Sequence, residues 1–486
     1  MKRATLEALG DDPFDVLVIG GGIYGLMAAR DAAMRGLRTA LVERDDFGGA
    51  TSHNSLKLMH GGIRYVQHLD ISRLRASARE RAFWQRAAAP VCQPMDFTIP
   101  LFGHGIRGPE AFAAAAALYT LASTGLRGPL YHGARAIGAK AARRRLGAFA
   151  PEERVSGGGI WRDGQLQDVN RLHMACLRAA IDAGALAANY MEVSALGGDG
   201  DRVTGVHLRD RLTGAEGAIR AGVTLSCTGK AAAALAGPHL RDRSLFTGFL
   251  RATNLVIDRD TRTSGIGVVS RSRSDAVVER GGRMYFFTPW QGHTIIGTHE
   301  SSAEGAADAD IDDLLTELQF ACPRLGLSRK DVVWVHQGLI PADIDDSRGA
   351  VQRQTRGSLL DHSAQGLDGL ISVAGVKYTT ARLIAERAVD AALRQLDRDA
   401  RPCRSFETPL PVDTSPDPDP RSDEPEVLAA RLRQAARGEM AVSLQDVAVR
   451  RTLWAETGLS QAPGVEDRLL RAAAIAGIPA QPPLRD

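Results

Sequence analysis

Apolar and polar positions near the start of the chain follow two different periods. The run FDVLVIG has the length and apolar character of a buried strand, and GGIYG is a glycine-rich turn. LMAARDAAMRG then places apolar residues on a helical period, and LRTALVERD is a second strand-length run. A helix between two such runs is the pattern of a β-turn-α-β unit. The sequence therefore predicts that this segment forms one.

The turn of this unit carries Gly20, Gly22 and Gly25, and Glu43 ends the second predicted strand, 18 residues beyond Gly25. Glycines at this spacing allow the turn and let backbone amides approach a pyrophosphate at the helix N-terminus. A carboxylate at the end of the second strand can accept hydrogen bonds from a ribose diol and would repel a 2′-phosphate. The unit therefore predicts a site for an adenine dinucleotide.

Downstream patterns predict a mixed α/β core into which an antiparallel sheet layer is inserted. Charged and apolar residues on a helical period predict helices at 69–89, 134–150 and 167–184. From about residue 185, short apolar runs between turn residues predict strands instead, and Gln291-Gly292 joins two of them as a hairpin.

The last part of the chain changes character twice. Residues 366–393 return to a strand, a glycine-containing turn and a helix. Residues 409–426 hold six prolines and several acids, which predicts an exposed linker, and residues 427–480 carry helical patterns throughout.

Composition narrows the class of protein. The 60 basic and 57 acidic residues leave a net charge of +3, so no overall field exists to hold a nucleic acid. The five cysteines are scattered without metal-ligand spacing, which predicts no metal site and favours a reduced cytoplasmic compartment. No stretch reaches the roughly 20 apolar residues that span a bilayer. The nearest, residues 108–126, predicts a helix packed on the protein and leaves a peripheral membrane contact open.

Two further segments favour FAD over a nicotinamide dinucleotide. Residues 50–68, ATSHNSLKLMHGGIRYVQH, gather three His, an Asn, a Lys, an Arg and a Gly pair, and are too polar for a core strand. Residues 223–229, VTLSCTG, form a strand pattern that ends in a small-residue turn. A tightly bound FAD threads through a protein and needs such segments, whereas a nicotinamide enzyme normally has its substrate domain elsewhere.

The segment ERDDFGGATSHNSLKLMHGGIRYVQH, residues 43–68, resembles the signature of the FAD-dependent glycerol-3-phosphate dehydrogenases. The likeness extends over most of the chain. It includes DVNRL, NLVIDR, FFTPWQGHTIIGTHE, GVKYTTARLIAE and EMAVSLQDVAVRRT, in this order.

The resemblance implies an α/β fold of the D-amino-acid-oxidase type, in which an FAD-binding Rossmann-like domain carries an inserted antiparallel β substrate cap and precedes a C-terminal α-helical domain. The oxidoreductase region is expected over residues 1–408. The expected parts are FAD-binding segments at about 13–95, 150–235 and 340–400, cap segments at about 96–149 and 236–339, the linker 409–426, and a short helical domain over 427–486.

The resemblance also implies an activity. Hydride would pass from a substrate carbon to flavin N5, which oxidises sn-glycerol 3-phosphate or a related polyol phosphate or hydroxy compound to the ketone. Electrons would pass on to a quinone or another acceptor. The expected location is cytoplasmic, with peripheral attachment to the inner face of the plasma membrane and a homo-oligomer both left open.

Residue by residue, the resemblance assigns two groups. The residues expected at catalysis and substrate are His60, Arg64, Tyr65, Arg353 and Lys377. The residues expected at the cofactor are Gly20, Gly22, Gly25, Glu43, Arg44, Thr51, Ser52, Ser55, Lys57, Leu58, His60, Gly61, Gly62, Thr228, Gly229, Gly375, Lys377, Thr379 and Thr380.

The chemistry is compatible with these roles. A secondary alcohol needs a base for its proton while hydride leaves, and His suits that role near neutral pH. Guanidinium groups suit a phosphate. Each of two residues has an alternative interpretation. His60 could form a hydrogen bond to the substrate or the flavin without acting as a base, and Lys57 could be a solvated charge on the surface. His53 and His68 are typical of loop or surface histidines.

Three features depart from the family. The arginine of a G-x-RP motif that grips the substrate phosphate is replaced by Ile340, in QGLIPA. Arg353, which matches the family's second arginine, could still serve, as could Arg64. Lys230 stands near the position of a family Trp, and the helical tail is short.

Three functions stay open from the sequence. The first is the dehydrogenase described above. The second is an amine or amino-acid oxidase of the same fold that uses oxygen, which the missing arginine favours slightly. The third is a catalytically inactive flavin-binding module.

Replacing Arg353 by Ala tests the expected phosphate contact. A charge-assisted contact to phosphate contributes about 1.5–3 kcal/mol, so Arg353→Ala should raise the KM for glycerol 3-phosphate by roughly tenfold to a hundredfold. Steady-state kinetics with glycerol as the unphosphorylated comparison provides the control. Equal effects on both substrates would argue against a phosphate role.

Overall fold

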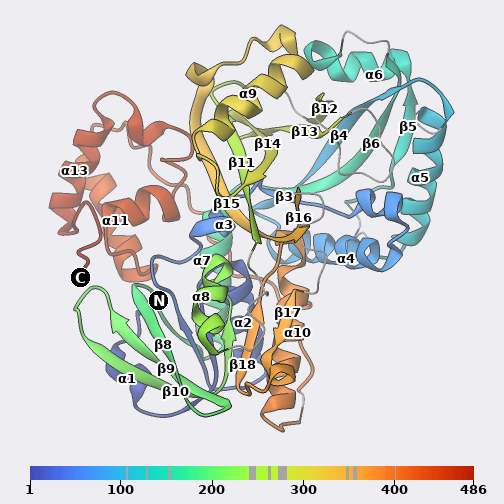
Figure 1. Cartoon of the computed structure of the whole chain (residues 1–486). Coiled ribbons are helices and arrows are strands. Elements are labelled where there is room, and N and C mark those ends of the chain that lie inside the picture. Colours follow the sequence, from blue (N-terminus) through green and yellow to red (C-terminus); the bar gives the residue numbers. More distant parts are fainter. Residues whose placement is uncertain are drawn as a thin grey trace. The chain divides into compact units, whose positions relative to one another are not determined.

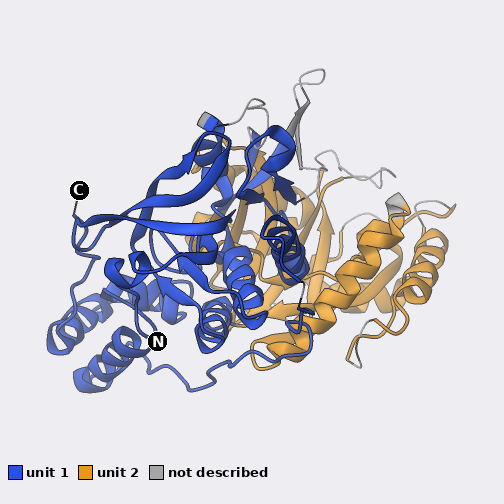
Figure 2. Ribbon diagram, turned by 90° about the horizontal axis from the view of Figure 1, so that it is seen from below, with its two compact units in different colours: residues 1–53, 168–250, 338–486 blue, residues 54–167, 251–337 orange. Residues whose placement is uncertain are grey.

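The computed structural model describes residues 1–105, 108–126, 128, 130–151, 155–239, 248–260, 264–271, 282–345, 350–353, 358–399 and 401–485. Of residues 67–68, 238, 343–345 and 350–353 it describes the backbone alone. The described chain packs as two compact units (Figure 2). Unit 1 comprises residues 1–53, 168–250 and 338–486, and unit 2 comprises residues 54–167 and 251–337. Residues 54–95, expected among the cofactor segments, thus pack in unit 2.

Unit 1 is built on a largely parallel sheet with the strand order β17-β18-β10-β1-β2-β7 (Figure 1). The strands of this sheet and of its antiparallel extension are β1 (Phe14–Ile19), β2 (Thr39–Val42), β7 (Leu186–Ala188), β8 (Met191–Asp199), β9 (Arg202–Asp210), β10 (Glu216–Ser226), β17 (Leu359–Asp361) and β18 (Leu370–Val373). Unit 1 also contains β16 (Ala350–Arg353), which pairs with β15 (Val332–Asp345) in the second sheet. Its helices are α1 (Leu6–Gly10), α2 (Ile23–Met34), α3 (Ala50–His53), α7 (Val169–Asp182), α8 (Ala232–Ala236), α10 (Ala381–Gln395), α11 (Pro425–Gly438), α12 (Leu444–Asp446) and α13 (Val465–Ala476).

The strands of this sheet are apolar on both faces because both faces are covered. Helix α2 packs on β1 and β2 and is itself covered by α7 and α10. The opposite face, which includes Leu17, Ile19 and Val42, packs against residues of the antiparallel strands β8 and β9 and of α1. Strand β10 serves both layers, since its first half pairs with β9 and its second half pairs with β1. The predicted β-turn-α-β unit is confirmed.

Unit 2 is built on a mainly antiparallel sheet with the strand order β16-β15-β11-β14-β13-β12-β4-β6-β3, and β5 pairs with β6. Its edge strand β16 belongs to unit 1 and pairs with the part of β15 that does so too. Its strands are β3 (Leu58–Met59), β4 (Cys92–Phe102), β5 (Arg135–Gly138), β6 (Val155–Leu166), β11 (Gly248–Ile257), β12 (Gly265–Val269), β13 (Met284–Trp290), β14 (His293–Ser302) and β15 (Val332–Asp345), the last of which continues into unit 1. Its helices are α4 (Ile71–Ala87), α5 (Pro109–Ala122), α6 (Ala139–Leu146) and α9 (Ala309–Ala321), and Ile63–His68 form the 3₁₀ helix η1.

The two faces of this sheet carry separate apolar clusters. Helices α6 and α9 cover one cluster, which includes Leu314 and Phe287. Helix α5 covers a second, in which Phe112 packs with Phe97 and Trp161. The predicted hairpin at Gln291-Gly292 is confirmed, since both residues have positive φ and β13 pairs with β14 around them.

The C-terminal helices form an apolar cluster that belongs to unit 1. Arg451 joins this cluster to the loop after β2, because its guanidinium binds both carboxylate oxygens of Asp46, at 2.7 and 2.8 Å. Asn189 also donates to Asp46, at 2.9 Å. Burial opposes the charge of Arg451, but the Asp46 carboxylate outweighs this effect and raises the pKa of Arg451 above its usual value.

The expected linker lacks helix and strand up to Glu424 and is mostly exposed. Helix α11 begins at Pro425, inside the expected linker. The segment is also anchored to unit 1, because Asp417 accepts hydrogen bonds from Arg171 at 3.0 Å and Arg431 at 2.7 Å.

Arg451→Met should destabilise the protein strongly. Removing one partner of a buried ion pair leaves the other charge without compensation, which costs about 3–5 kcal/mol. Denaturant unfolding of the variant should show a loss of that size. The double variant Asp46→Asn with Arg451→Met should lose less than Arg451→Met alone, and an equal or larger loss would contradict the role of uncompensated charge.

Candidate functional site

The glycine turn after β1 is too crowded for side chains. Gly20 has φ +99°, and a Cβ on it would lie 2.6 Å from the carbonyl oxygen of Cys227. A Cβ on Gly25 would overlap the carbonyl oxygen of Gly20. Gly20 is therefore required by its positive φ, and Gly25 is required because helix α2 packs closely on the backbone at the end of β1.

Polar groups surround the N-terminus of α2. The hydroxyl of Ser52 accepts a hydrogen bond from the amide of Ile23 at 2.9 Å, and a Cβ on Gly22 would lie 2.9 Å from the same oxygen. Glu43 accepts from the amides of Gly21 at 2.5 Å and Asp45 at 2.9 Å, and its burial raises the pKa of its carboxyl. A glycine cradle at a helix N-terminus, with an acid at the next strand end, fits the diphosphate and ribose of FAD.

A second turn of unit 1, residues 375–380, is tied to the first. Tyr24 in the first turn of α2 donates its hydroxyl proton to the carbonyl of Lys377 at 2.6 Å, and a Cβ on Gly375 would overlap the Tyr24 ring. Thr380 contacts the same carbonyl oxygen at 3.4 Å, and Thr379 is buried. Helix α10 begins directly after this turn, so the turn lies at a helix N-terminus.

A third turn follows β10, whose end lies beside the end of β1. The amide of Cys227 donates to the carbonyl of Ile19 at 2.8 Å, and the hydroxyls of Ser226 and Thr228 lie 3.1 Å apart. Gly229 has φ +57°. Unit 1 therefore brings together the strand ends at which the predicted residues Thr228 and Gly229 and the glycine turn lie.

Arg44 is directed elsewhere. Its guanidinium is largely exposed and lies 3.0 Å from Glu192 on β8. This surface pair does not support the expected role of Arg44 at the cofactor.

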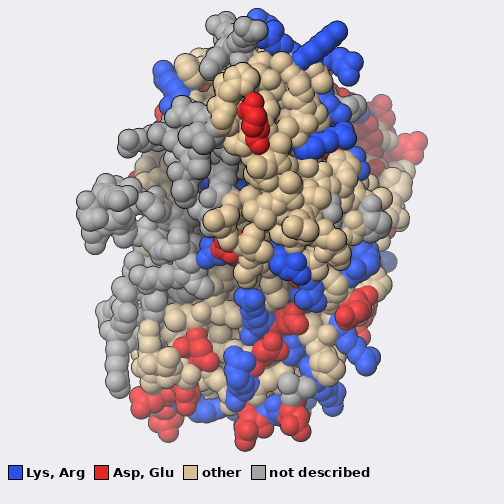
Figure 3. All heavy atoms as spheres, turned by 90° about the vertical axis from the view of Figure 1, so that its right-hand side faces the viewer, with Lys and Arg blue, Asp and Glu red and all other residues tan. Residues whose placement is uncertain are grey.

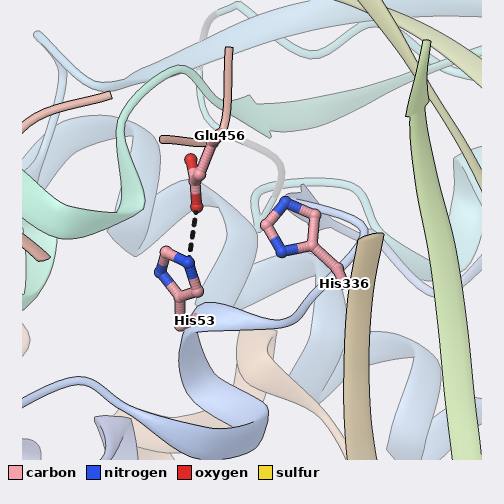
Figure 4. Close-up of side chains that lie close together, drawn as sticks. All are labelled: His53, His336 and Glu456. Carbon is pink, nitrogen blue, oxygen red and sulfur yellow. Dashed lines mark ion pairs between the residues drawn. The ribbon is translucent and has the colours of Figure 1, made fainter. Parts of the chain in front are cut away.

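His53 is buried in unit 1, so its interpretation as a surface histidine is wrong. Its Nε2 lies 3.0 Å from Glu456 Oε1 (Figure 4), and its Nδ1 lies 3.2 Å from Asn170 Oδ1. Because Glu456 belongs to the C-terminal region, that region anchors the start of the polar stretch. Thr51, two residues before His53 on α3, donates a hydrogen bond from its hydroxyl to the carbonyl of Leu339 at 2.7 Å. His336, also labelled in Figure 4, belongs to unit 2.

In unit 2, Lys57 is fully buried and has φ +57°, so its interpretation as a solvated surface charge is wrong. Its ammonium lies 5.3 Å from the ring centroid of Trp290. The amide of Lys57 contacts the hydroxyl of Ser55 at 3.3 Å. Leu58 packs in the apolar cluster beneath α5.

Asp163 on β6 is the centre of the polar groups around His60. Its Oδ1 accepts from the amide of Gly61 and from Arg81, each at 2.7 Å. Its Oδ2 accepts from Trp161 Nε1 at 3.0 Å and lies 3.3 Å from His60 Nδ1. Burial would raise the pKa of Asp163, but the contacts with His60 and Arg81 outweigh burial and hold that pKa well below its usual range.

Both glycines after His60 have packing reasons. A Cβ on Gly61 would overlap the Arg81 guanidinium, and Gly62 has φ +86° with Ser77 and Leu74 close by. The chain then enters η1, on which Arg64 is exposed and Tyr65 is half-buried. The His60 side chain is 44% exposed, so it is accessible from outside unit 2.

The remaining residues singled out in the sequence differ in how much of them the structure describes and in their burial. Arg353 lies in β16, but its side chain is outside the described residues, as is that of His68. Ile340 is buried in β15, and Lys230 is exposed.

Sequence reasoning missed Asp163, Arg81 and Tyr24. A signal for the first existed, since an Asp in the middle of an apolar and glycine-rich strand pattern is seldom buried without a partner. The partner itself, in a helix 82 residues earlier, could not be identified from the pattern.

Comparisons with known proteins agree with a fold that binds FAD. The model of the family "FAD dependent oxidoreductase" matches residues 15–391. A glycerol-3-phosphate dehydrogenase of Synechocystis sp. is 32% identical over 416 residues, which are 82% of this chain and 73% of that protein. The human mitochondrial glycerol-3-phosphate dehydrogenase is 31% identical over 425 residues, and the chain spans about half (54%) of its length.

Among solved structures, the glycerol-3-phosphate dehydrogenase of Bacillus halodurans, complexed with FAD, superposes with a TM-score of 0.68. The match covers 97% of this chain and 92% of that one at 23% identity, and it supports the fold alone. The expected fold class is thereby confirmed, and the family and its cofactor follow from the sequence matches. The chain belongs to the FAD-dependent oxidoreductases and, within them, to the glycerol-3-phosphate dehydrogenase family.

Proposed function

We propose that the protein oxidises sn-glycerol 3-phosphate to dihydroxyacetone phosphate. The observation that carries the proposal is His60, an accessible imidazole whose Nδ1 lies against the buried carboxylate of Asp163. A base of this kind suits an alcohol, whose proton must leave together with the hydride. The identity of about 32% to a glycerol-3-phosphate dehydrogenase over most of the chain favours this substrate over an amine.

The residues of the chain would divide the reaction between them. Bound FAD would supply the hydride acceptor. His60 Nε2 would take the proton of the C2 hydroxyl, so that the carbon loses a hydride and the oxygen loses a proton as the ketone forms. Lys377 and the N-terminus of α10 would favour negative charge at the pyrimidine end of the flavin.

Phosphate binding would depend on Arg64 and Arg353. Arg64 is exposed on η1 and its guanidinium suits a phosphate dianion. Ile340 contributes no charge, so a substrate phosphate would have fewer cationic partners than in relatives with an arginine there. A weaker preference for phosphorylated substrates follows from this reasoning.

We also propose that the electrons pass to a quinone and that unit 2 contacts an anionic membrane surface. Among the described residues, no helix is long and apolar enough to cross a bilayer. Helix α5 carries one charge, Glu110, and its outward face is formed by alanines and Leu121, which is 74% exposed. Its inward face, with Phe112 and Tyr119, packs on unit 2.

Basic side chains border this α5 face. Arg75 of α4 donates to the carbonyl of Ala122 at the end of α5, at 2.8 Å. The upper part of Figure 3 shows a broad surface that is mostly free of charged side chains, apart from an acidic one, with Lys and Arg side chains along its upper and right edges. An apolar face with a basic rim matches the chemistry of anionic lipid headgroups over acyl chains. A homo-oligomer stays a prediction.

Anaerobic addition of glycerol 3-phosphate to the purified FAD-loaded protein should bleach the absorbance of oxidised flavin. Two electrons then leave the substrate for the flavin, so one equivalent of ketone should form for each flavin reduced. Absorbance spectroscopy with an enzymatic assay of dihydroxyacetone phosphate measures both. Flavin that dithionite reduces but glycerol 3-phosphate does not would refute the proposed substrate, and bleaching by amino acids would favour the oxidase.

Leu121→Glu should weaken binding to vesicles that contain phosphatidylglycerol by about tenfold or more, because burying a Leu side chain contributes about 1.5–3 kcal/mol. Vesicle co-sedimentation at low and high salt measures the effect. Leu470→Glu, on the exposed side of α13 in unit 1, is the matched control and should bind like the unaltered protein. Equal binding by all three proteins would refute the α5 surface as the contact.

A further inference from the structure

We propose that Asp163 is a positioning residue that fixes the tautomer of His60, with Arg81 as the charge that keeps Asp163 ionised inside unit 2. The ring is held with Nδ1–H toward Asp163, so that Nε2 carries the lone pair that accepts the substrate's proton. This inference rests on the proposed function for its catalytic consequence. The tautomer itself depends only on the contacts within unit 2.

The partners of Asp163 decide the tautomer. The Gly61 amide, the Arg81 guanidinium and the Trp161 indole can only donate hydrogen bonds. Three obligatory donors require the carboxylate to act as acceptor at both oxygens. The fourth contact, at 3.3 Å, therefore has to be a donation from His60 Nδ1. In a neutral imidazole a proton on Nδ1 leaves the lone pair on Nε2.

Arg81 is itself held in place inside the unit. It is fully buried, its guanidinium carbon lies 4.0 Å from the ring centroid of Tyr131, and its Nη1 donates to the carbonyl of Arg162 at 2.7 Å and to the Tyr119 hydroxyl at 3.1 Å. A buried carboxylate without such a partner would become protonated. The pair therefore keeps the negative charge of Asp163 available to His60.

The titratable and charged groups that face this pair come from every element packed around it. They are His60 after β3, Arg81 on α4, Cys92 on β4, Tyr119 on α5, Tyr131 before β5 and Asp163 on β6. The raised pKa values of Cys92, about 12, and of Tyr131, both caused mainly by burial, keep those two groups neutral at physiological pH.

The same contacts account for the first glycine after His60. A side chain at position 61 would occupy the space of the Arg81 guanidinium. Because the Gly61 amide donates to the same carboxylate as the His60 ring, backbone and side chain of neighbouring residues are fixed by one group.

In the reaction the proton of the substrate hydroxyl would pass to His60 Nε2, and the resulting imidazolium would lie against the Asp163 carboxylate. Asp163 would stay ionised throughout, as the carboxylate of a hydrolytic triad does. Loss of the carboxylate would therefore slow the proton transfer in two ways, by releasing the ring tautomer and by removing the charge that stabilises the imidazolium.

The test is Asp163→Asn in the FAD-loaded protein. The rate of flavin reduction by glycerol 3-phosphate in anaerobic stopped flow should fall by about 10²- to 10⁴-fold. The Kd for the substrate, from the dependence of that rate on concentration, should change by less than about threefold. His60→Asn combined with Asp163→Asn should be no slower than His60→Asn alone, because the two residues act as a unit. A threefold or smaller effect of Asp163→Asn on the rate would overturn the proposal.

A second readout does not need the substrate. Long-range ¹H–¹⁵N spectra of protein with ¹⁵N-labelled histidine distinguish a protonated from an unprotonated ring nitrogen, and His60→Asn assigns the His60 signals. The unaltered protein should show the proton on Nδ1 of His60 and the lone pair on Nε2. Asp163→Asn should shift the ring toward the form with the proton on Nε2. A His60 ring that carries its proton on Nε2 in the unaltered protein would also overturn the proposal. A protein that glycerol 3-phosphate does not reduce, but whose His60 ring carries the proton on Nδ1, would refute the proposed function alone.

Two further variants control for folding. Asp96→Asn removes a carboxylate from β4 beside the same strand, where Asp96 pairs with Arg162 at 2.6 Å, and should leave both the rate and the His60 tautomer unchanged. If Asp163→Asn fails to fold because Arg81 stays buried and uncompensated, Asp163→Asn with Arg81→Met removes both charges. This double variant should show the same loss of rate and the same change of the His60 tautomer. An unchanged rate or an unchanged tautomer would contradict the assignment.

Discussion

Two buried aspartates hold the polar stretch in place, because a carboxylate inside a protein has to be paired and hydrogen-bonded to stay ionised. Asp46 lies just before the stretch in unit 1 and binds Arg451 through both oxygens. Asp163 in unit 2 binds Arg81, the amide of Gly61 and the side chain of His60. Each pair therefore anchors one end of the segment that carries the candidate chemistry.

These anchors explain why helices remote in sequence matter to the site. The C-terminal region contributes Arg451 to the loop after β2 and Glu456 to His53. Helix α4 contributes Arg81 to the strand that bears Asp163. Both helical segments thus stabilise backbone that FAD or substrate would contact, without contacting either ligand in the proposed arrangement.

The cofactor region of unit 1 shows how glycine and close packing act together. Three turns converge at the ends of β1, β10 and β18, and Tyr24 links the first to the last through the carbonyl of Lys377. A larger residue at position 25 or 375 would collide with the backbone of Gly20 or with the Tyr24 ring. Ile340 on β15 is buried and apolar, so it adds no charge to unit 1.

The sequence by itself determined the β-turn-α-β unit and the glycine cradle with Glu43 at the next strand end, because periodicity and turn chemistry are local properties. It also predicted a functional role for the polar residues 50–68. It also pointed to His60. Only the tertiary structure decided that Lys57 and His53 are buried, that Arg44 pairs with Glu192 and that Asp163 meets His60. The physical reason is that compensation of a buried charge depends on partners tens or hundreds of residues away. Such partners become neighbours only when the strands and helices pack.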